Sequence, residues 1–173
     1  MIVILIGYMA SGKSTIGRQL ADKVNYQFVD LDDYIEEREK MSIVDLFKAK
    51  GEIYFRKIES IYLKEIIEEN DNLILSLGGG TPCYGQNMEY LKKAINVNSI
   101  YLKASIGTLV NRLENEKSKR PLVAHLKTQE ELIEFIGKHL FERNQFYSLA
   151  NETFVTDKLA TEAIVKAIRN KLF

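Results

Sequence analysis

Residues 7–14 have the types and spacing of a loop that binds phosphate. They read Gly-Tyr-Met-Ala-Ser-Gly-Lys-Ser, which fits G-x-x-x-x-G-K-[ST] between a short apolar run and a stretch of helical spacing. In such a loop the backbone N–H groups and the helix dipole hold phosphate oxygens, Lys13 places a positive charge between the β- and γ-phosphates, and Ser14 offers a hydroxyl to Mg²⁺. The pattern predicts a nucleoside triphosphate site, with a ligand-free strand-to-helix turn as the alternative. It does not identify the group that accepts a phosphoryl group.

A cluster of carboxylates follows the second predicted strand. Asp30, Asp32 and Asp33 come directly after residues 27–29. Because the carboxyl ends of parallel strands form the ligand crevice of an open α/β sheet, we expect these side chains beside the phosphate loop. A solvated turn or a helix N-cap explains them equally well, and the spacing does not decide between these readings.

Two further patterns suit an acceptor pocket. A helix over 51–59 would place Glu52, Arg56 and Glu59 on one side, where a surface ion pair is the alternative. Three glycines, at 78–80, follow the predicted strand at 73–77. They allow a ligand to press against bare backbone, although a flexible turn would have the same composition.

The segment over about 114–124 is polar and has no apolar face to bury. We expect it to be a mobile lid that carries Arg120, because phosphoryl transfer requires water to be excluded and positive charge to be brought to the transferring group. An ordinary solvated loop is the alternative. Arg143, in the helix predicted after it, has the spacing of a surface residue as much as of a binding residue.

Five short β-branched segments alternate with stretches of helical spacing. The strands are predicted over 2–6, 27–29, 73–77, 99–102 and 153–155. The first helix should begin within 11–14, and the last should bury Ile164, Ile168 and Leu172. The first strand is apolar on both faces, as a central parallel strand must be. The fold class is therefore α/β, a three-layer α/β/α sandwich.

Composition limits the remaining possibilities. A chain of 173 residues with 46% apolar residues suits one domain, and 24 basic against 24 acidic residues argue against general binding to nucleic acid or acidic membranes. Cys83 is the single cysteine, so no internal disulfide forms and, with two histidines, ligands for a structural zinc are too few. The apolar run at 2–6 is not a signal peptide, and no stretch approaches the ~20 apolar residues of a membrane span. We expect a cytoplasmic protein.

Taken in order, these motifs resemble the shikimate kinase family. The resemblance rests on the loop at 7–14, Phe-Val-Asp-Leu-Asp at 28–32, residues 43–47, Gly-Glu-x-x-Phe-Arg-x-x-Glu at 51–59, Leu-Ser-Leu-Gly-Gly-Gly at 75–80, Arg-Pro-Leu at 120–122, and Glu-Arg at 142–143 with Tyr147. It implies a P-loop kinase with a nucleoside-monophosphate-kinase-like fold and a parallel sheet in the order 2-3-1-4-5. It also implies an ATP-dependent enzyme that phosphorylates the 3-hydroxyl of shikimate, giving shikimate 3-phosphate and ADP in aromatic amino-acid biosynthesis. We expect the protein to be a monomer.

The resemblance also assigns residues by matching position. Nucleotide contacts are implied for Gly7, Ala10, Ser11, Gly12, Lys13, Ser14, Thr15, Arg112 and Arg120. Ser14 and, through water, Asp30 would hold Mg²⁺. Within a substrate-binding region at about 31–60, Asp32 would contact the ring hydroxyls and take the proton, and Glu59 would support Arg56.

The remaining roles complete the substrate pocket. Arg56 and Arg143 would grip the carboxylate of shikimate, a role that suits guanidinium forks. Gly78, Gly79 and Gly80 would bring backbone against the ring, and Arg120 would reach the transferring phosphate.

The chain departs from the family pattern in two places. Ala10 stands where the family often has glycine, and the segment after Val155 lacks the arginine that often stacks on adenine, so Arg112 is expected to pack over the base instead. His125 and His139 have no partner pattern and are expected to be solvated or merely packed.

Two other functions compete with this one. Another small-molecule kinase of the same architecture, for gluconate or a nucleoside monophosphate, is disfavoured by Arg56 with Glu59 and by the triple glycine. A nucleotide-dependent switch without catalysis is disfavoured by Asp32 and Arg120, because a switch needs neither an acceptor-side carboxylate nor a lid arginine.

Overall fold

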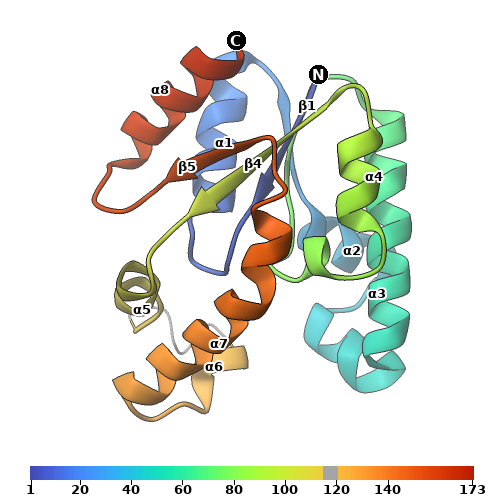
Figure 1. The fold of residues 1–173 in the computed structure, drawn as a ribbon. Helices are drawn as coiled ribbons and strands as arrows, with labels where there is room; N and C mark the ends of the chain where they lie inside the picture. Colours follow the sequence, from blue (N-terminus) through green and yellow to red (C-terminus); the bar gives the residue numbers. More distant parts are fainter. Residues whose placement is uncertain (115–120) are drawn as a thin grey trace.

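The computed structural model describes residues 1–114 and 121–173 and contains one parallel sheet (Figure 1). Its strands are β1 (Ile2–Ile6), β2 (Gln27–Asp30), β3 (Leu73–Ser76), β4 (Val97–Lys103) and β5 (Glu152–Val155). They pair in the order β2-β3-β1-β4-β5, which confirms the predicted order. The predicted strand ends lie within one residue of the observed ones, except that β4 begins two residues earlier than expected.

Helices cover both faces of the sheet. On one side lie α1 (Lys13–Val24) and α8 (Thr161–Leu172). The remaining helices are α2 (Leu31–Glu39), α3 (Ile43–Glu69), η1 (Thr81–Cys83), α4 (Asn87–Lys93), α5 (Ile106–Glu114), α6 (Pro121–Ala124) and α7 (Gln129–Tyr147). The three-layer α/β/α sandwich is therefore confirmed.

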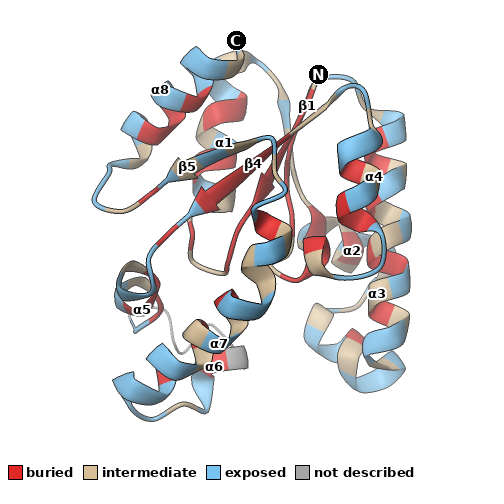
Figure 2. Cartoon of the chain, viewed as in Figure 1, coloured by how far each residue is buried: buried red, intermediate tan, exposed pale blue. Residues whose placement is uncertain are grey.

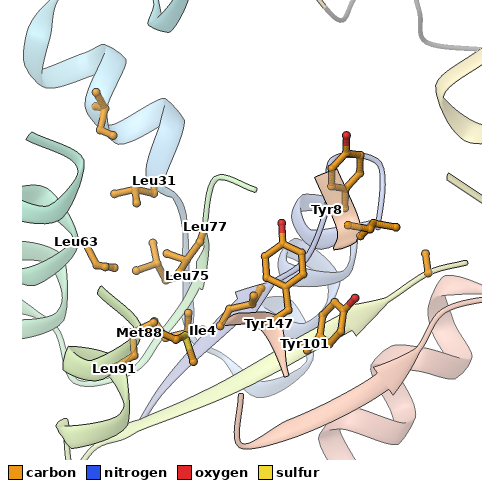
Figure 3. Packing of buried hydrophobic residues seen from close by; sticks show 14 of the residues in the cluster. Ile4, Tyr8, Leu31, Leu63, Leu75, Leu77, Met88, Leu91, Tyr101 and Tyr147 are labelled. Carbon is orange, nitrogen blue, oxygen red and sulfur yellow. The ribbon is translucent and has the colours of Figure 1, made fainter. Parts of the chain in front are cut away.

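The burial of β1 explains why this strand is apolar throughout. Val3 and Leu5 pack in the core cluster beneath α1 and α8, whereas Ile2, Ile4 and Ile6 belong to the larger cluster on the opposite face. Figure 2 shows β1 as a continuous buried strand at the centre of the molecule, and Figure 3 shows side chains of the larger cluster. Because neither face of β1 meets water, the phosphate loop that follows it starts from a rigid element.

Two helix predictions need correction. Gly51 has φ 81° and ψ 171°, so α3 is kinked there and the helix predicted over 51–59 begins only after this glycine. The stripe of α8 is buried at Ile164 and Ile168, but Leu172 in its last turn is only half-buried. By contrast, α1 begins at Lys13, inside the predicted range.

Most of the predicted lid over about 114–124, including Arg120, lies outside the described residues. The described end of that segment corrects the sequence prediction, because residues 121–124 form the short helix α6 and Val123 is fully buried. Proline is favoured at the first position of a helix, where its missing N–H is not needed. Val123 thus gives residues 121–124 a buried apolar contact where few were expected. No helix in the described residues is long and apolar enough to cross a membrane.

Candidate active site

The phosphate loop has a backbone that requires both glycines of its motif. Gly7 has φ 153°, and a Cβ there would lie 2.7 Å from the carbonyl oxygen of Leu102. Gly12 is the N-cap of α1 with φ 99°. Ala10 has φ 61°, a conformation that glycine adopts without strain, so alanine at this position carries a small local cost.

The side chains of the loop are held by its own carbonyls and by β2. The ammonium group of Lys13 donates to the backbone oxygens of Gly7 and Tyr8, both at 3.0 Å. Ser14 Oγ donates to Asp30 Oδ2 at 2.8 Å. The other oxygen of Asp30 accepts from the backbone N–H of Asp32 at 3.2 Å and caps α2. Both readings of Asp30 therefore hold, because one carboxylate caps a helix and also faces the phosphate loop.

An open cavity of about 560 Å³ lies over the loop at the carboxyl ends of the strands. Its walls contain the predicted residues Ala10, Ser11, Gly12, Lys13, Ser14, Thr15, Asp30, Asp32, Gly78, Gly79 and Arg112. They also contain Thr156 and Leu159, which no sequence motif indicated. Their position after β5 was the available signal, since all parallel strands end on this side of the sheet.

Arg112 links two walls of this cavity. Its Nη1 donates to the carbonyl oxygen of Ala10 at 2.9 Å, and its Nη2 donates to that of Thr156 at 3.3 Å. The guanidinium therefore ties the phosphate loop to the segment after β5. The structure places it at the cavity wall, and its predicted packing over a nucleotide base remains a prediction.

The triple glycine brings the acceptor-side residues together. A Cβ at any of the three positions would approach a predicted site residue. The distances from such a carbon are 3.0 Å from Gly78 to Asp32 Oδ1, 3.4 Å from Gly79 to Arg143 Nη1, and 2.8 Å from Gly80 to Arg56 Nη2. The Cβ position of Gly79 also lies 3.6 Å from the carbonyl oxygen of Gly7. The three glycines thus let two arginines and a carboxylate converge beside the phosphate loop.

Arg56 is held by two carboxylates and an aromatic ring. Its Nη1 donates to Glu59 Oε2 at 2.9 Å, and Glu59 is 1% exposed and accepts from Thr81 Oγ1 at 2.6 Å. The Arg56 Cζ lies 3.8 Å from the ring centre of Tyr84, a contact that no sequence spacing indicated. The pair with Glu59 is therefore largely buried and oriented, whereas Glu52 Oε1, 3.4 Å from Arg56 Nε, forms the surface ion pair that was the alternative.

Arg143 has a different environment. It is half-buried on α7, and its Cζ lies 5.6 Å from the ring centre of Tyr8. Within residues 1–114 and 121–173 no carboxylate lies within ion-pair distance of its guanidinium. Such a cation beside Gly79, a residue of the cavity wall, is suited to an anionic ligand.

Asp32 has the electrostatic environment of a general base. Burial and the nearby carboxylates of Asp30 and Glu59 raise the pKa of Asp32 to about 7, against the opposing effect of Lys13. A carboxyl group that titrates near neutral pH is able both to accept and to release a proton during a reaction.

A family model described as shikimate kinase matches residues 9–173. The chain belongs to the shikimate kinase family. A shikimate kinase of Flavobacterium psychrophilum is 47% identical over 171 residues, which cover 99% of this chain and 98% of the relative. The crystal structure of a shikimate kinase from Bacteroides thetaiotaomicron has a TM-score of 0.91 and 35% identity, covering 99% of this chain and 98% of that one.

A shikimate kinase from Acinetobacter baumannii, solved in complex with shikimate, has a TM-score of 0.84 and 29% identity, covering 99% of this chain and 95% of that one. A deoxyadenosine kinase from M. mycoides, 23% identical with a TM-score of 0.60, shares only the fold. Together with the sheet order, these relatives confirm the P-loop kinase fold that the sequence motifs predicted.

Proposed function

We infer that this shikimate kinase family member transfers the γ-phosphoryl group of ATP to the 3-hydroxyl of shikimate, giving shikimate 3-phosphate and ADP in aromatic amino-acid biosynthesis. The observation that carries this inference is the triple glycine. A Cβ at Gly78, Gly79 or Gly80 would lie within 3.4 Å of Asp32, Arg143 or Arg56, respectively, and Gly78 and Gly79 line the cavity over the phosphate loop. A small polyol with one carboxylate matches this combination of two guanidinium groups, one carboxyl group and bare backbone.

In the proposed reaction, Arg56 and Arg143 bind the carboxylate of shikimate and orient its ring. Asp32 accepts the proton of the attacking hydroxyl while that oxygen bonds to the γ-phosphorus and the bond to the departing ADP oxygen breaks. The ammonium group of Lys13 stabilises the negative charge on the transferring group. Glu59 keeps Arg56 in place through their 2.9 Å hydrogen bond.

The residues beside the loop also fit a magnesium ion. Ser14 and Asp30 offer a hydroxyl and a carboxylate whose oxygens lie 2.8 Å apart, and Mg²⁺ prefers oxygen ligands and retains several waters. No group of three or more His, Cys, Asp or Glu side chains in the described residues forms a metal site by itself. Nucleotide oxygens and water would therefore complete the coordination, and the bound ion would neutralise charge on the phosphates.

ADP release with a panel of acceptors tests the proposed function. We expect ATP-dependent ADP formation with shikimate and no comparable rate with gluconate or nucleoside monophosphates. A higher rate with one of those acceptors would identify a different small-molecule kinase. Nucleotide binding without ADP formation from any acceptor would instead indicate a switch.

Replacing Gly80 with alanine tests the pocket without disturbing the backbone. Gly80 has φ −92° and ψ −22°, which alanine adopts freely, but the new methyl group would lie 2.8 Å from Arg56 Nη2. Because the guanidinium must move, we expect KM for shikimate to rise roughly tenfold with little change in melting temperature. Gly107→Ala is the matched control, since a Cβ there meets nothing within 4 Å. An unchanged KM for shikimate in Gly80→Ala would show that Arg56 does not bind the substrate.

The lid over about 114–124, with its Arg120, remains a prediction from the sequence, as do the monomeric state and the cytoplasmic location. Trypsin tests the lid, because Lys117 and Lys119 are cleavable and the bond from Arg120 to Pro121 is protected. We expect cleavage to slow most when an unreactive ATP analogue and shikimate are both bound, since Arg120 then gains phosphate oxygens as partners. Equal rates in the free, singly and doubly bound protein would contradict the lid assignment.

A further inference from the structure

The phosphate loop is in direct contact with α7 through a tyrosine and a histidine. The hydroxyl of Tyr8 and Nδ1 of His139 lie 3.1 Å apart, and Tyr8 is only 1% exposed. His139 also packs against the ring of Phe135, with ring centres 4.2 Å apart. The expectation that His139 has no specific partner is therefore wrong, because the fold brings it to a loop residue 131 positions away.

The protonation states of the two groups define the contact. Burial raises the pKa of Tyr8 to about 12, against the opposing charge of Arg143. Burial and, next, the charge of Arg143 lower the pKa of His139. The phenol is therefore protonated at neutral pH, and the Tyr8 hydroxyl and Nδ1 share one hydrogen bond whose donor is set by the tautomer of His139.

A second side chain of α7, that of Arg143, also lies against Tyr8. Arg143 follows His139 by four residues, one turn along α7, and its guanidinium carbon lies 5.6 Å from the centre of the Tyr8 ring. In Figure 3 the rings of Tyr8 and Tyr147 rise from the core with both hydroxyls pointing the same way. Tyr147 is fully buried and donates its hydroxyl hydrogen to the carbonyl oxygen of Gly79. This hydrogen bond fixes the Tyr147 side chain against the backbone of Gly79.

We propose that Tyr8 and His139 are positioning residues for Arg143. The hydrogen bond to His139 fixes the orientation of the Tyr8 ring, and the fixed ring gives the guanidinium of Arg143 a defined face on which to lie. This role rests on the proposed function, in which Arg143 binds the substrate carboxylate. It matters most for Arg143 because the described residues offer it no carboxylate partner, whereas Arg56 has Glu59.

Steady-state kinetics of matched variants test the proposal. Tyr8→Phe removes only the hydroxyl and leaves the ring, and the half-buried His139 can then bond to water. We expect Tyr8→Phe and His139→Leu each to raise KM for shikimate about three- to tenfold, with kcat and KM for ATP within twofold, as the loss of one hydrogen bond implies. The double variant should be no worse than the poorer single variant. His139→Asn, which restores a polar group near Nδ1, should recover most of the affinity.

Two further variants separate the possible failures. Glu134→Gln replaces an exposed side chain on the same helix, α7, and should leave all constants unchanged. Arg143→Lys should raise KM for shikimate; if it does not, the proposed role of Arg143 in substrate binding is wrong. If Arg143→Lys raises this KM but Tyr8→Phe and His139→Leu do not, only the positioning role fails. A shift confined to KM for ATP would also overturn it, because the contact would then serve Lys13 through the Tyr8 carbonyl.

Discussion

Replacement of Lys13 by methionine is expected to lower kcat about 10³-fold or more while the chain still folds. The ammonium group is the positive charge that the loop directs at the β- and γ-phosphates, and methionine keeps the length of the side chain but not the charge. The two hydrogen bonds from Lys13 to loop carbonyls are lost, but the backbone of the loop is set by Gly7 and Gly12. Initial rates of ADP formation measure the effect.

Lys23→Met is the matched control for this variant. Lys23 lies in the last turn of the same helix and is exposed, so its replacement should leave kcat unchanged. Circular dichroism of both variants should match that of the parent protein. Retained activity in a correctly folded Lys13→Met variant would overturn the assignment of residues 7–14 as the catalytic phosphate loop.

Asp32→Asn is expected to lower kcat by about 10²- to 10⁴-fold, the usual contribution of a positioned general base. The parent enzyme should also lose kcat as the pH falls through about 7, because the base is then protonated. In Asp32→Asn this acid limb should disappear. Asp33→Asn is the control, since that neighbouring side chain is exposed and should affect kcat little.

Arg56→Lys is expected to affect substrate binding, in contrast to the effect of Asp32→Asn on kcat. An ammonium group cannot reproduce a bidentate fork, so this variant should mainly raise KM for shikimate. If Asp32→Asn and Arg56→Lys both change only KM, Asp32 positions the acceptor and is not the base.

The same carboxyl group makes a prediction about stability. The pKa of Asp32 is raised on folding, so its contribution to stability is fully present below its unfolded pKa and is lost as the pH rises through about 7. Asp32→Asn removes the cost of burying this charge. The melting temperature of the variant minus that of the parent protein should therefore increase from pH 5 to pH 8. A difference in melting temperature that does not change with pH would contradict the raised pKa.

The elements whose patterns are local were predictable from the sequence. The five strands, the start of α1 at Lys13 and the phosphate loop depend on apolar runs and on glycine positions within a few residues of each other. One exception is local, because Gly51 interrupts a helical pattern, and the other is tertiary, because the core buries Val123. The spacing of residue types along the chain does not show how strongly one such residue affects the structure of its segment.

The candidate active site also combines features that were predictable from local sequence with features that depend on tertiary contacts. The types of residue that the reaction needs were predictable from the chain, since a phosphate loop, acidic residues after a strand and a triple glycine each have a chemical reason. Which of them meet depends on the fold: Gly80 lies close to Arg56, the ring of Tyr84 contacts the same guanidinium, and Tyr8 contacts His139. These contacts join residues from separate helices and loops that are far apart in the sequence and that the sheet topology brings together. Packing, not local spacing, therefore determines them.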